Sequence, residues 1–196
     1  MCRLLIQIVF YALYSVAAIA WQQDHSEQKL ANYGDKDIEW FIKEIEENSR
    51  KKPALAVELA HQVFETKLNS LSQREKVQIL NAESYALYFL GDYKKSMEKA
   101  KNAEEISVKE GFISLTARSK VLQGNILQTI NEFTKSIQKY QEAAKIYKQE
   151  NDLASLGSCY NNMANTYFRA GLHDISLNYF NLYRETLSPE EKKASA

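Results

Sequence analysis

The chain has 196 residues, of which 45% are hydrophobic and 26% are charged, a composition typical of one folded domain rather than a disordered chain. Its 25 basic and 25 acidic residues give a formal net charge of zero, which argues against a nucleic-acid-binding protein. Six glycines and two prolines supply few of the turns that sheets need, so we expect an all-α protein.

The first twenty residues differ from the rest of the chain. One positive charge, Arg3, precedes an uncharged run over 4–20 that ends in Ala18-Ile19-Ala20. A basic start, an apolar run and two small residues flanking one position are the pattern of a secretory signal peptide. We therefore predict cleavage after Ala20 and an exported protein, periplasmic or extracellular. The alternative is an uncleaved membrane anchor, because 17 uncharged residues are near the lower limit for a membrane-spanning helix.

Residues 21–36 are predicted to form a linker, and the mature chain after it would keep one cysteine. Cys2 would leave with the signal peptide, so Cys159 would have no partner for an internal disulfide. Cys159 lies on the apolar side of its predicted helix, beside Tyr160. We expect it to be a small buried hydrophobic residue.

Three similar segments begin 40 residues apart, at Gly91, Asn131 and Gly171. Within each segment and the residues before it, apolar side chains recur three and four positions apart, which is the spacing of one helix face. Each copy is therefore predicted to be a pair of helices. The aligned columns include Ser96, Ser136 and Ser176; Ala100, Tyr140 and Phe180; and Ser84, Gly124 and Ala164.

The predicted pairs follow one another along the chain and end at Pro189, which cannot continue a helix. The last residues, 190–196, are predicted to form a polar tail. The predicted ranges are a degenerate first pair over 37–68 and clearer copies over 72–110, 112–150 and 152–188.

At two positions in these copies, the expected backbone conformation or helix packing explains which residue is present. Asn131 replaces the glycine found at Gly91 and Gly171, as expected at a turn that needs positive φ. Gly124 lies in the middle of a predicted helix, where glycine costs about 1 kcal/mol relative to alanine. We therefore expect two paired helices to approach closely at Gly124.

Two motifs in the pairs carry a resemblance to a known family. The first helix has two aromatic residues around a large and a small residue, and the second helix has a small residue four positions before an aromatic one. The matching residues are Tyr160, Met163, Ala164 and Tyr167, followed by Ser176 and Phe180, with Ser136 and Tyr140 in the preceding copy. In these motifs residues 37–189 resemble tetratricopeptide repeats. The resemblance implies an α-solenoid, a superhelical array of antiparallel helix pairs.

The chain departs from the commonest tetratricopeptide form in two ways. Leu80 and Lys120 replace the opening aromatic residue, and the spacing is 40 residues rather than about 34. The longer spacing resembles a long-helix variety found in the exported sensory regions of bacterial diguanylate cyclases and histidine kinases. This leaves an alternative function, the sensory input region of a signalling protein whose membrane and catalytic parts lie outside the chain.

The resemblance also implies a binding site, because the first helices of tetratricopeptide repeats line a concave groove that holds extended peptides. Asn125 and Asn165 share one column of the groove face, where a carboxamide can bond the C=O and N–H groups of a peptide. We therefore predict a protein or peptide partner; the alternative is that these asparagines are only polar surface residues. The predicted groove residues are Gln78, Asn81, Tyr85, Tyr88, Arg118, Val121, Asn125, Gln128, Ser158, Asn161, Asn165 and Phe168.

The last predicted helix carries apolar residues in columns that are polar in the earlier copies. Tyr179 and Leu182 occupy these positions, whose earlier members are Lys99, Lys139, Asn102 and Glu142. Because a terminal repeat normally needs a polar outer face, we predict an interface here for a partner or for a second copy in a homodimer. The alternative is an exposed patch that the protein tolerates.

No group of residues indicates catalysis or metal binding. His25, His61 and His173 are scattered, without acidic residues at metal-ligand spacing. The sequence also lacks a glycine-rich phosphate loop and a Gly-x-Ser-x-Gly elbow. We therefore expect a non-catalytic binding module that uses no metal and no cofactor.

Overall fold

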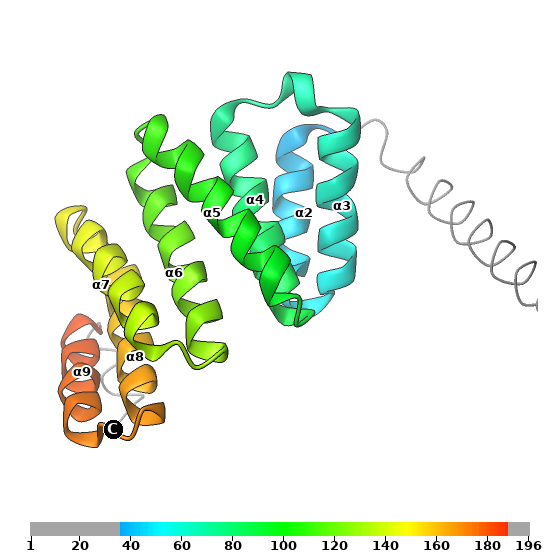
Figure 1. The fold of residues 1–196 in the computed structure, drawn as a ribbon. Helices are drawn as coiled ribbons and strands as arrows, with labels where there is room; N and C mark the ends of the chain where they lie inside the picture. Colours follow the sequence, from blue (N-terminus) through cyan, green and yellow to red (C-terminus); the bar gives the residue numbers. More distant parts are fainter. Residues whose placement is uncertain (1–35, 188–196) are drawn as a thin grey trace, which may run out of the picture. The chain divides into compact units, whose positions relative to one another are not determined.

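The computed structural model describes residues 36–187, and its regular structure in that range is entirely helical (Figure 1). The predicted all-α class is confirmed. The predicted signal peptide with Ala18 and Ala20, nearly all of the linker and the polar tail lie outside the described residues. The helices are α2 (Ile38–Lys51), α3 (Pro53–Thr66), η1 (Leu68–Ser70), α4 (Gln73–Phe89), α5 (Tyr93–Lys109), α6 (Ile113–Thr129), α7 (Phe133–Gln149), α8 (Leu153–Arg169) and α9 (His173–Thr186).

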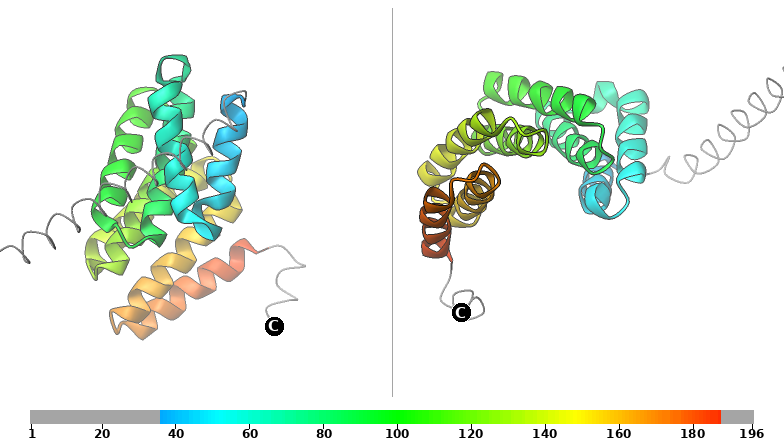
Figure 2. Two further views of the ribbon diagram at one scale, coloured as in Figure 1. Left: turned by 90° about the vertical axis from the view of Figure 1, so that its right-hand side faces the viewer. Right: turned by 60° about the horizontal axis from the view of Figure 1, so that its bottom comes forward.

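The helices of residues 38–187 form successive pairs in two layers. Helix α4 packs against α5, α6 against α7 and α8 against α9, and each second helix also packs against the first helix of the next pair. The first helices contact one another, α2 with α4, α4 with α6 and α6 with α8. They therefore form the inner layer of the stack, and α5, α7 and α9 form the outer layer (Figure 2). This is the arrangement of an α-solenoid.

The five turns that connect α4 through to α9 all have the same geometry, which the α2–α3 and α3–α4 connections do not share. Each contains one residue with positive φ, and these residues are Gly91, Gly111, Asn131, Asn151 and Gly171. The N–H of the next residue donates to a carbonyl in the last turn of the preceding helix, as from Asp92 to Leu87 at 3.0 Å and from Leu172 to Tyr167 at 2.9 Å. This pattern is the Schellman motif, which needs a left-handed residue at its centre. The prediction of positive φ at Asn131 is confirmed.

A serine on each of α5, α7 and α9 hydrogen-bonds the backbone of its partner helix. Ser136 Oγ donates to the Gly124 carbonyl at 2.8 Å, and Ser176 Oγ donates to the Ala164 carbonyl at 2.8 Å. Ser96 and Ser84 make the equivalent contact in the first copy. All of these serines are buried. The serine column therefore fixes how the two helices of each pair align.

The small residue opposite this column lets the helices approach closely. A Cβ atom added to Gly124 would lie 2.5 Å from Cε1 of Tyr140, which is closer than real Cβ contacts. Tyr140 is fully buried in α7, at the centre of the pair. The predicted close approach at Gly124 is therefore confirmed, and the Tyr140 ring is the group that requires it.

The core between α7 and α8 includes the single cysteine of the described range. Cys159 is fully buried beside Met163 and Tyr140. Burial raises the pKa of the Cys159 thiol to about 12, so the thiol stays protonated and unreactive at neutral pH. The expectation that Cys159 is a buried hydrophobic residue is confirmed.

Lys120, which departs from the repeat motif, is the centre of an ion cluster between α5, α6 and α7. Its Nζ lies 2.5 Å from a carboxylate oxygen of Glu104 and 2.6 Å from one of Glu142. Gln123 and Lys139 also contact Glu104. Burial opposes the ionised form of Glu104, but hydrogen bonds from Lys120 and Gln123 outweigh it and lower the pKa of Glu104.

This lowered pKa predicts how acid acts on the fold. Because the folded-state pKa of Glu104 lies below its unfolded value, the cluster stabilises the protein at neutral pH and loses this contribution as the pH falls through and below the usual glutamate range, about 4. Replacing Lys120 with methionine should reduce that acid-induced loss by about 0.5–1 kcal/mol. Urea unfolding of both proteins at several pH values measures the difference. Parallel stability curves for the two proteins would contradict the assignment.

Candidate functional site

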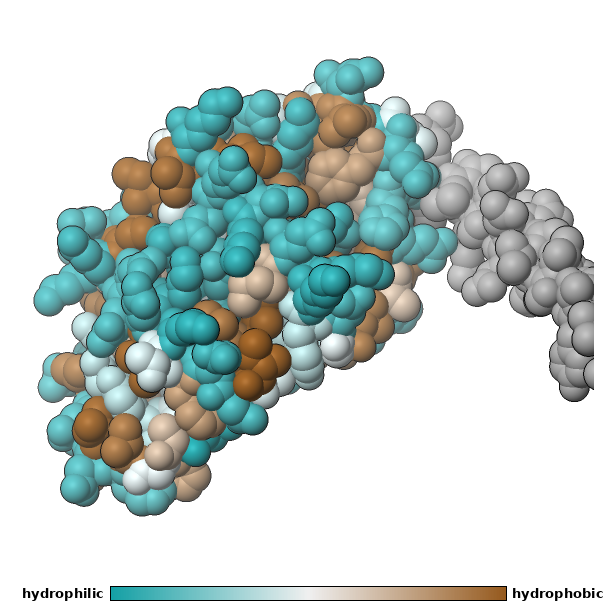
Figure 3. Space-filling model, in the orientation of Figure 1, coloured by the Kyte–Doolittle hydropathy of each residue, from teal (hydrophilic) through white to brown (hydrophobic). Residues whose placement is uncertain are grey.

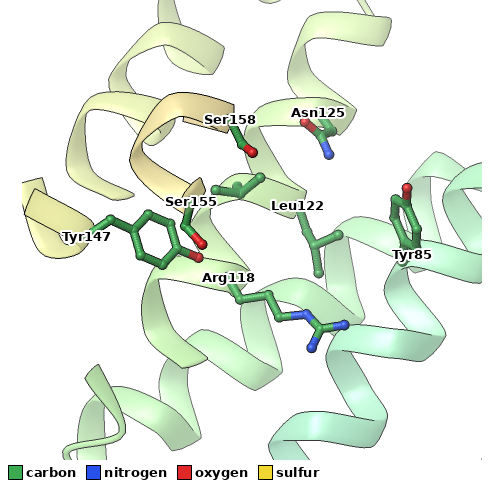
Figure 4. Close-up of a pocket in the computed structure, with 8 residues that line it drawn as sticks. Tyr85, Arg118, Leu122, Asn125, Tyr147, Ser155 and Ser158 are labelled. Carbon is green, nitrogen blue, oxygen red and sulfur yellow. The ribbon is translucent and has the colours of Figure 1, made fainter. Parts of the chain in front are cut away.

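A pocket of about 340 Å³ opens among the inner helices α4, α6 and α8, with one residue contributed by α7 (Figure 4). Helix α6 contributes half of the lining residues because its residues 118, 121, 122 and 125 recur at helical spacing and share one face. The lining residues are Tyr85, Arg118, Val121, Leu122, Asn125, Tyr147, Ser155 and Ser158.

Arg118 is the charged residue among those that line the pocket, and it is bound to a carboxylate from a distant helix. Its guanidinium nitrogen lies 2.7 Å from an oxygen of Glu46 in α2. The pair therefore joins α2 to α6. The side chain of Arg118 is 42% exposed and that of Glu46 is 33% exposed, so solvent reaches both partners.

Asn125 has a structural contact as well as a place in the pocket lining. Its carbonyl oxygen accepts a hydrogen bond of 2.8 Å from the Tyr140 hydroxyl and one of 3.4 Å from the Asn162 amide. The amide nitrogen lies on the pocket side in Figure 4. Asn125 can therefore donate to a ligand, while its oxygen is already used by the protein.

Hydroxyl groups complete the polar lining. Ser155 and Ser158 lie three residues apart in α8, and Asp152 caps this helix by accepting a bond of 3.0 Å from the Ser155 backbone N–H. Tyr147 points its hydroxyl toward the same space (Figure 4). Burial raises the pKa of Tyr147 to about 12, so this hydroxyl remains a donor at neutral pH.

One predicted groove residue is placed wrongly by the sequence reasoning. Asn81 is fully buried, and its carbonyl oxygen accepts a hydrogen bond of 2.8 Å from Ser119 Oγ in α6. Helix α6 packs over this position, so Asn81 connects α4 to α6 and is not open to a ligand. The assignment of Asn81 to the groove is therefore corrected.

The other predicted groove residues divide into two sets. The structure brings Tyr85, Arg118 and Asn125 together with Val121 and Ser158 in the pocket. The remaining ones lie outside it: Gln78, Tyr88, Gln128, Asn161, Asn165 and Phe168.

Some of the residues outside the pocket have other contacts. The Tyr88 hydroxyl lies 3.0 Å from Thr129 Oγ1, and the Gln128 amide donates to Thr166 Oγ1 at 2.7 Å. Both contacts link one inner helix to the next. Phe168 is exposed and meets the ring of His173 edge-on.

Three lining residues and the partner of Arg118 were missed from the sequence. Ser155 was detectable in principle because it lies one turn before Ser158 on the same helix face. Leu122 and Tyr147 are an apolar and an aromatic residue of the kind expected in a core, so no sequence feature pointed to a place in the groove. Glu46 had no sequence signal, because its approach to Arg118 depends on how the helix pairs stack.

The predicted interface on the last helix is partly occupied within the chain. Tyr179 stacks on Tyr167 with ring centroids 5.3 Å apart, and it lies 6.2 Å from Tyr160. Tyr179 is therefore partly buried against α8. Leu182 is exposed, and Figure 3 shows hydrophobic side chains on the surface at this end of the stack. An interface or homodimer through Leu182 stays a prediction.

Neither a metal site nor a membrane-spanning helix is found among the described residues. Residues 36–187 contain no group of three or more His, Cys, Asp or Glu side chains placed to hold a metal ion. Within the same range, none of the helices has the length and apolar character needed to cross a membrane.

The model of one known protein family matches most of the described residues. The family model described as soluble NSF attachment protein, SNAP, matches residues 49–183, from the end of α2 into α9. The chain belongs to the soluble NSF attachment protein family. No curated protein matches it. The SNAP-family match supports the predicted helical-repeat scaffold, while the long-helix sensory variety stays a prediction.

Two solved structures are similar to this SNAP-family chain in fold. The apo form of RapI has a TM-score of 0.67 at 18% identity, over 85% of this chain and 62% of RapI. BtubC (BKLC) from P. vanneervenii has a TM-score of 0.55 at 15% identity, over 84% of this chain and 75% of BtubC. The chain thus spans less than two thirds of RapI. At these identities the likeness concerns the fold.

Proposed function

We propose that this SNAP-family chain is a non-catalytic scaffold that binds a protein or peptide in the pocket between α4, α6 and α8. The observation that carries the proposal is the convergence of Tyr85, Arg118, Asn125 and the α8 serines on one open pocket. They come from three successive inner helices, so a ligand bound there would extend along the stack. The family is named for attachment to NSF, and protein binding is the part of that description that this geometry supports.

The chemistry of the lining suits a polypeptide. Hydroxyl and amide groups can donate to and accept from a peptide backbone, while Val121 and Leu122 offer apolar contact. Each net hydrogen bond contributes about 0.5–1.5 kcal/mol, and ordering of the ligand offsets part of the total. We therefore expect modest affinity from a preformed surface.

The setting that we propose is the cell envelope, periplasmic or extracellular. Its support is the signal-peptide pattern ending at Ala18 and Ala20. The alternative role, sensory input to a diguanylate cyclase or histidine kinase, is supported by the long repeat spacing alone.

A substitution that fills the pocket tests the binding proposal. Ser158 is exposed on α8 at the pocket, so Ser158→Trp should block the pocket without disturbing the core. Peptides selected from a random phage-displayed library on the full chain should lose at least about tenfold in affinity for this variant, which corresponds to about 1.4 kcal/mol. Fluorescence anisotropy with the selected peptides measures the change.

The matched control places the same indole on the outer layer. Gln141 is exposed on α7 and does not line the pocket, so Gln141→Trp should leave peptide affinity unchanged. Asn125→Ala is a poorer test because it would leave the buried Tyr140 hydroxyl without its acceptor. Selected peptides that bind Ser158→Trp as tightly as the original chain would show that the ligand site lies elsewhere.

A further inference from the structure

The charge of the proposed ligand site comes from one residue. Seven of the eight lining residues are neutral, and Arg118 contributes a permanent positive charge. Its planar guanidinium can donate two parallel hydrogen bonds to a carboxylate. Tyr147 and Ser155 add hydroxyl groups in the same pocket, and the Ser158 hydroxyl there donates to the Ala154 carbonyl at 3.1 Å. The site therefore favours an anionic group, and one such group rather than several.

The protein itself supplies a carboxylate to this arginine. Glu46 reaches Arg118 from α2, 72 positions earlier in the sequence, and does not line the pocket. An ion pair that is this open to solvent contributes little net stability, because water solvates both partners when the pair separates. A second carboxylate can thus replace Glu46 at small cost. Arg118 stays paired throughout such an exchange, and the displaced Glu46 carboxylate, which is 33% exposed, is solvated by water.

We propose that the pocket accepts an aspartate or glutamate side chain of the bound polypeptide and that Glu46 competes with this side chain for Arg118. The inference rests on the proposed function. The bound segment is expected to carry one acidic residue among neutral neighbours, because the rest of the lining is uncharged. Binding would separate Glu46 from Arg118 and so release the contact between α2 and α6. Glu46 therefore acts as an internal competitor that lowers the affinity for acidic ligands.

Two blocked hexapeptides test the proposal with the full chain. One carries a single central glutamate and the other carries glutamine at that position. In nitrogen-15 NMR titrations, the glutamate peptide should shift the backbone amides of Ser155 and Ser158 and the side-chain signal of Arg118. Glu46→Gln should tighten binding of this peptide by about two- to fivefold, the range expected for loss of a competing exposed ion pair. Arg118→Gln should abolish the preference for glutamate over glutamine.

The neighbouring residue gives a matched control. Glu47 also lies on α2, but it faces Lys43 at 4.0 Å instead of Arg118. Glu47→Gln changes the net charge by the same amount as Glu46→Gln and should leave the affinity unchanged. An equal gain in both variants would mean a general charge effect and would overturn the competition at Arg118.

The other outcomes separate this inference from the proposed function. If neither peptide shifts the Ser155 and Ser158 amides, even with Glu46→Gln, the pocket is not a peptide site and both proposals fail. Equal binding of the two peptides keeps the pocket but overturns the acidic preference. A preference for glutamate that Glu46→Gln leaves unchanged in strength overturns the competition. Stronger binding of an unblocked peptide without acidic side chains would mean that Arg118 binds the C-terminal carboxylate of a peptide instead of an acidic side chain.

Discussion

Replacing Tyr140 with alanine is expected to lower the free energy of unfolding by about 3–5 kcal/mol. Tyr140 is fully buried, lies against Gly124 and belongs to the core shared by α7 and α8. Truncation would remove an aromatic ring from two helix interfaces and leave a cavity, because the surrounding helices relax only partly. Urea unfolding of the full chain, followed by circular dichroism, measures the loss.

A second substitution tests whether Tyr140 is the reason for Gly124. In the original chain, Gly124→Ala should destabilise, because its Cβ would lie 2.5 Å from the Tyr140 ring. With Tyr140→Ala already present, the same change should stabilise by about 1 kcal/mol, because alanine is the better helix former. The sign of the effect should therefore reverse between the two backgrounds. Effects of equal sign and size would mean that the glycine has another cause.

Replacing Lys99 with methionine is expected to destabilise the protein by about 2–3 kcal/mol. Lys99 Nζ lies 2.9 Å from a carboxylate oxygen of Glu83, a fully buried residue of α4. His61 contacts the same oxygen at 3.1 Å, and the other oxygen is buried without a hydrogen-bond partner among the described residues. Removing the ammonium group would leave a buried carboxylate with little compensation. Chemical unfolding at neutral pH measures the cost.

The same column of the next copy provides the control for this result. Lys139 is 26% exposed and Lys99 is 24% exposed, but Glu104, the partner of Lys139, has further donors in Lys120 and Gln123. Lys139→Met should therefore cost only about 0–1 kcal/mol. Adding Glu83→Gln to Lys99→Met should recover most of the lost stability, because the buried charge is removed. Similar costs at Lys99 and Lys139 would contradict a special role for the buried Glu83.

The fold was largely predictable because its signals are local and repeated. Helical spacing, turn residues and the small column each depend on neighbours within about one helix pair, and they recur at a 40-residue offset. Gly124 was informative since its cost in a helix requires a compensating close contact. Even Lys120, which departs from the aromatic motif, lies in an ordinary helical position and exchanges ring packing for ion pairs.

The candidate site was less predictable because it depends on contacts between pairs. Helical phase placed Asn81 and Asn125 on similar faces, yet α6 buries Asn81 while Asn125 remains at the pocket. The helical periodicity of the sequence shows which residues share a helix face, but it does not show which of them the next helix covers. The contact of Glu46 with Arg118 depends on the stacking of three successive pairs, and a sequence pattern carries no information on that angle.

The uniform Schellman turns have a consequence for how such a chain changes in length. From α4 to α9, connections within pairs and connections between pairs have the same hydrogen bonds and the same left-handed residue, so these turns do not distinguish one kind from the other. The pairing is encoded in the helices, by the buried serines at 96, 136 and 176 and the carbonyls that they meet. A duplication or deletion of one 40-residue unit would therefore create no new type of joint, and the number of units is free to vary independently of the rules that assemble them.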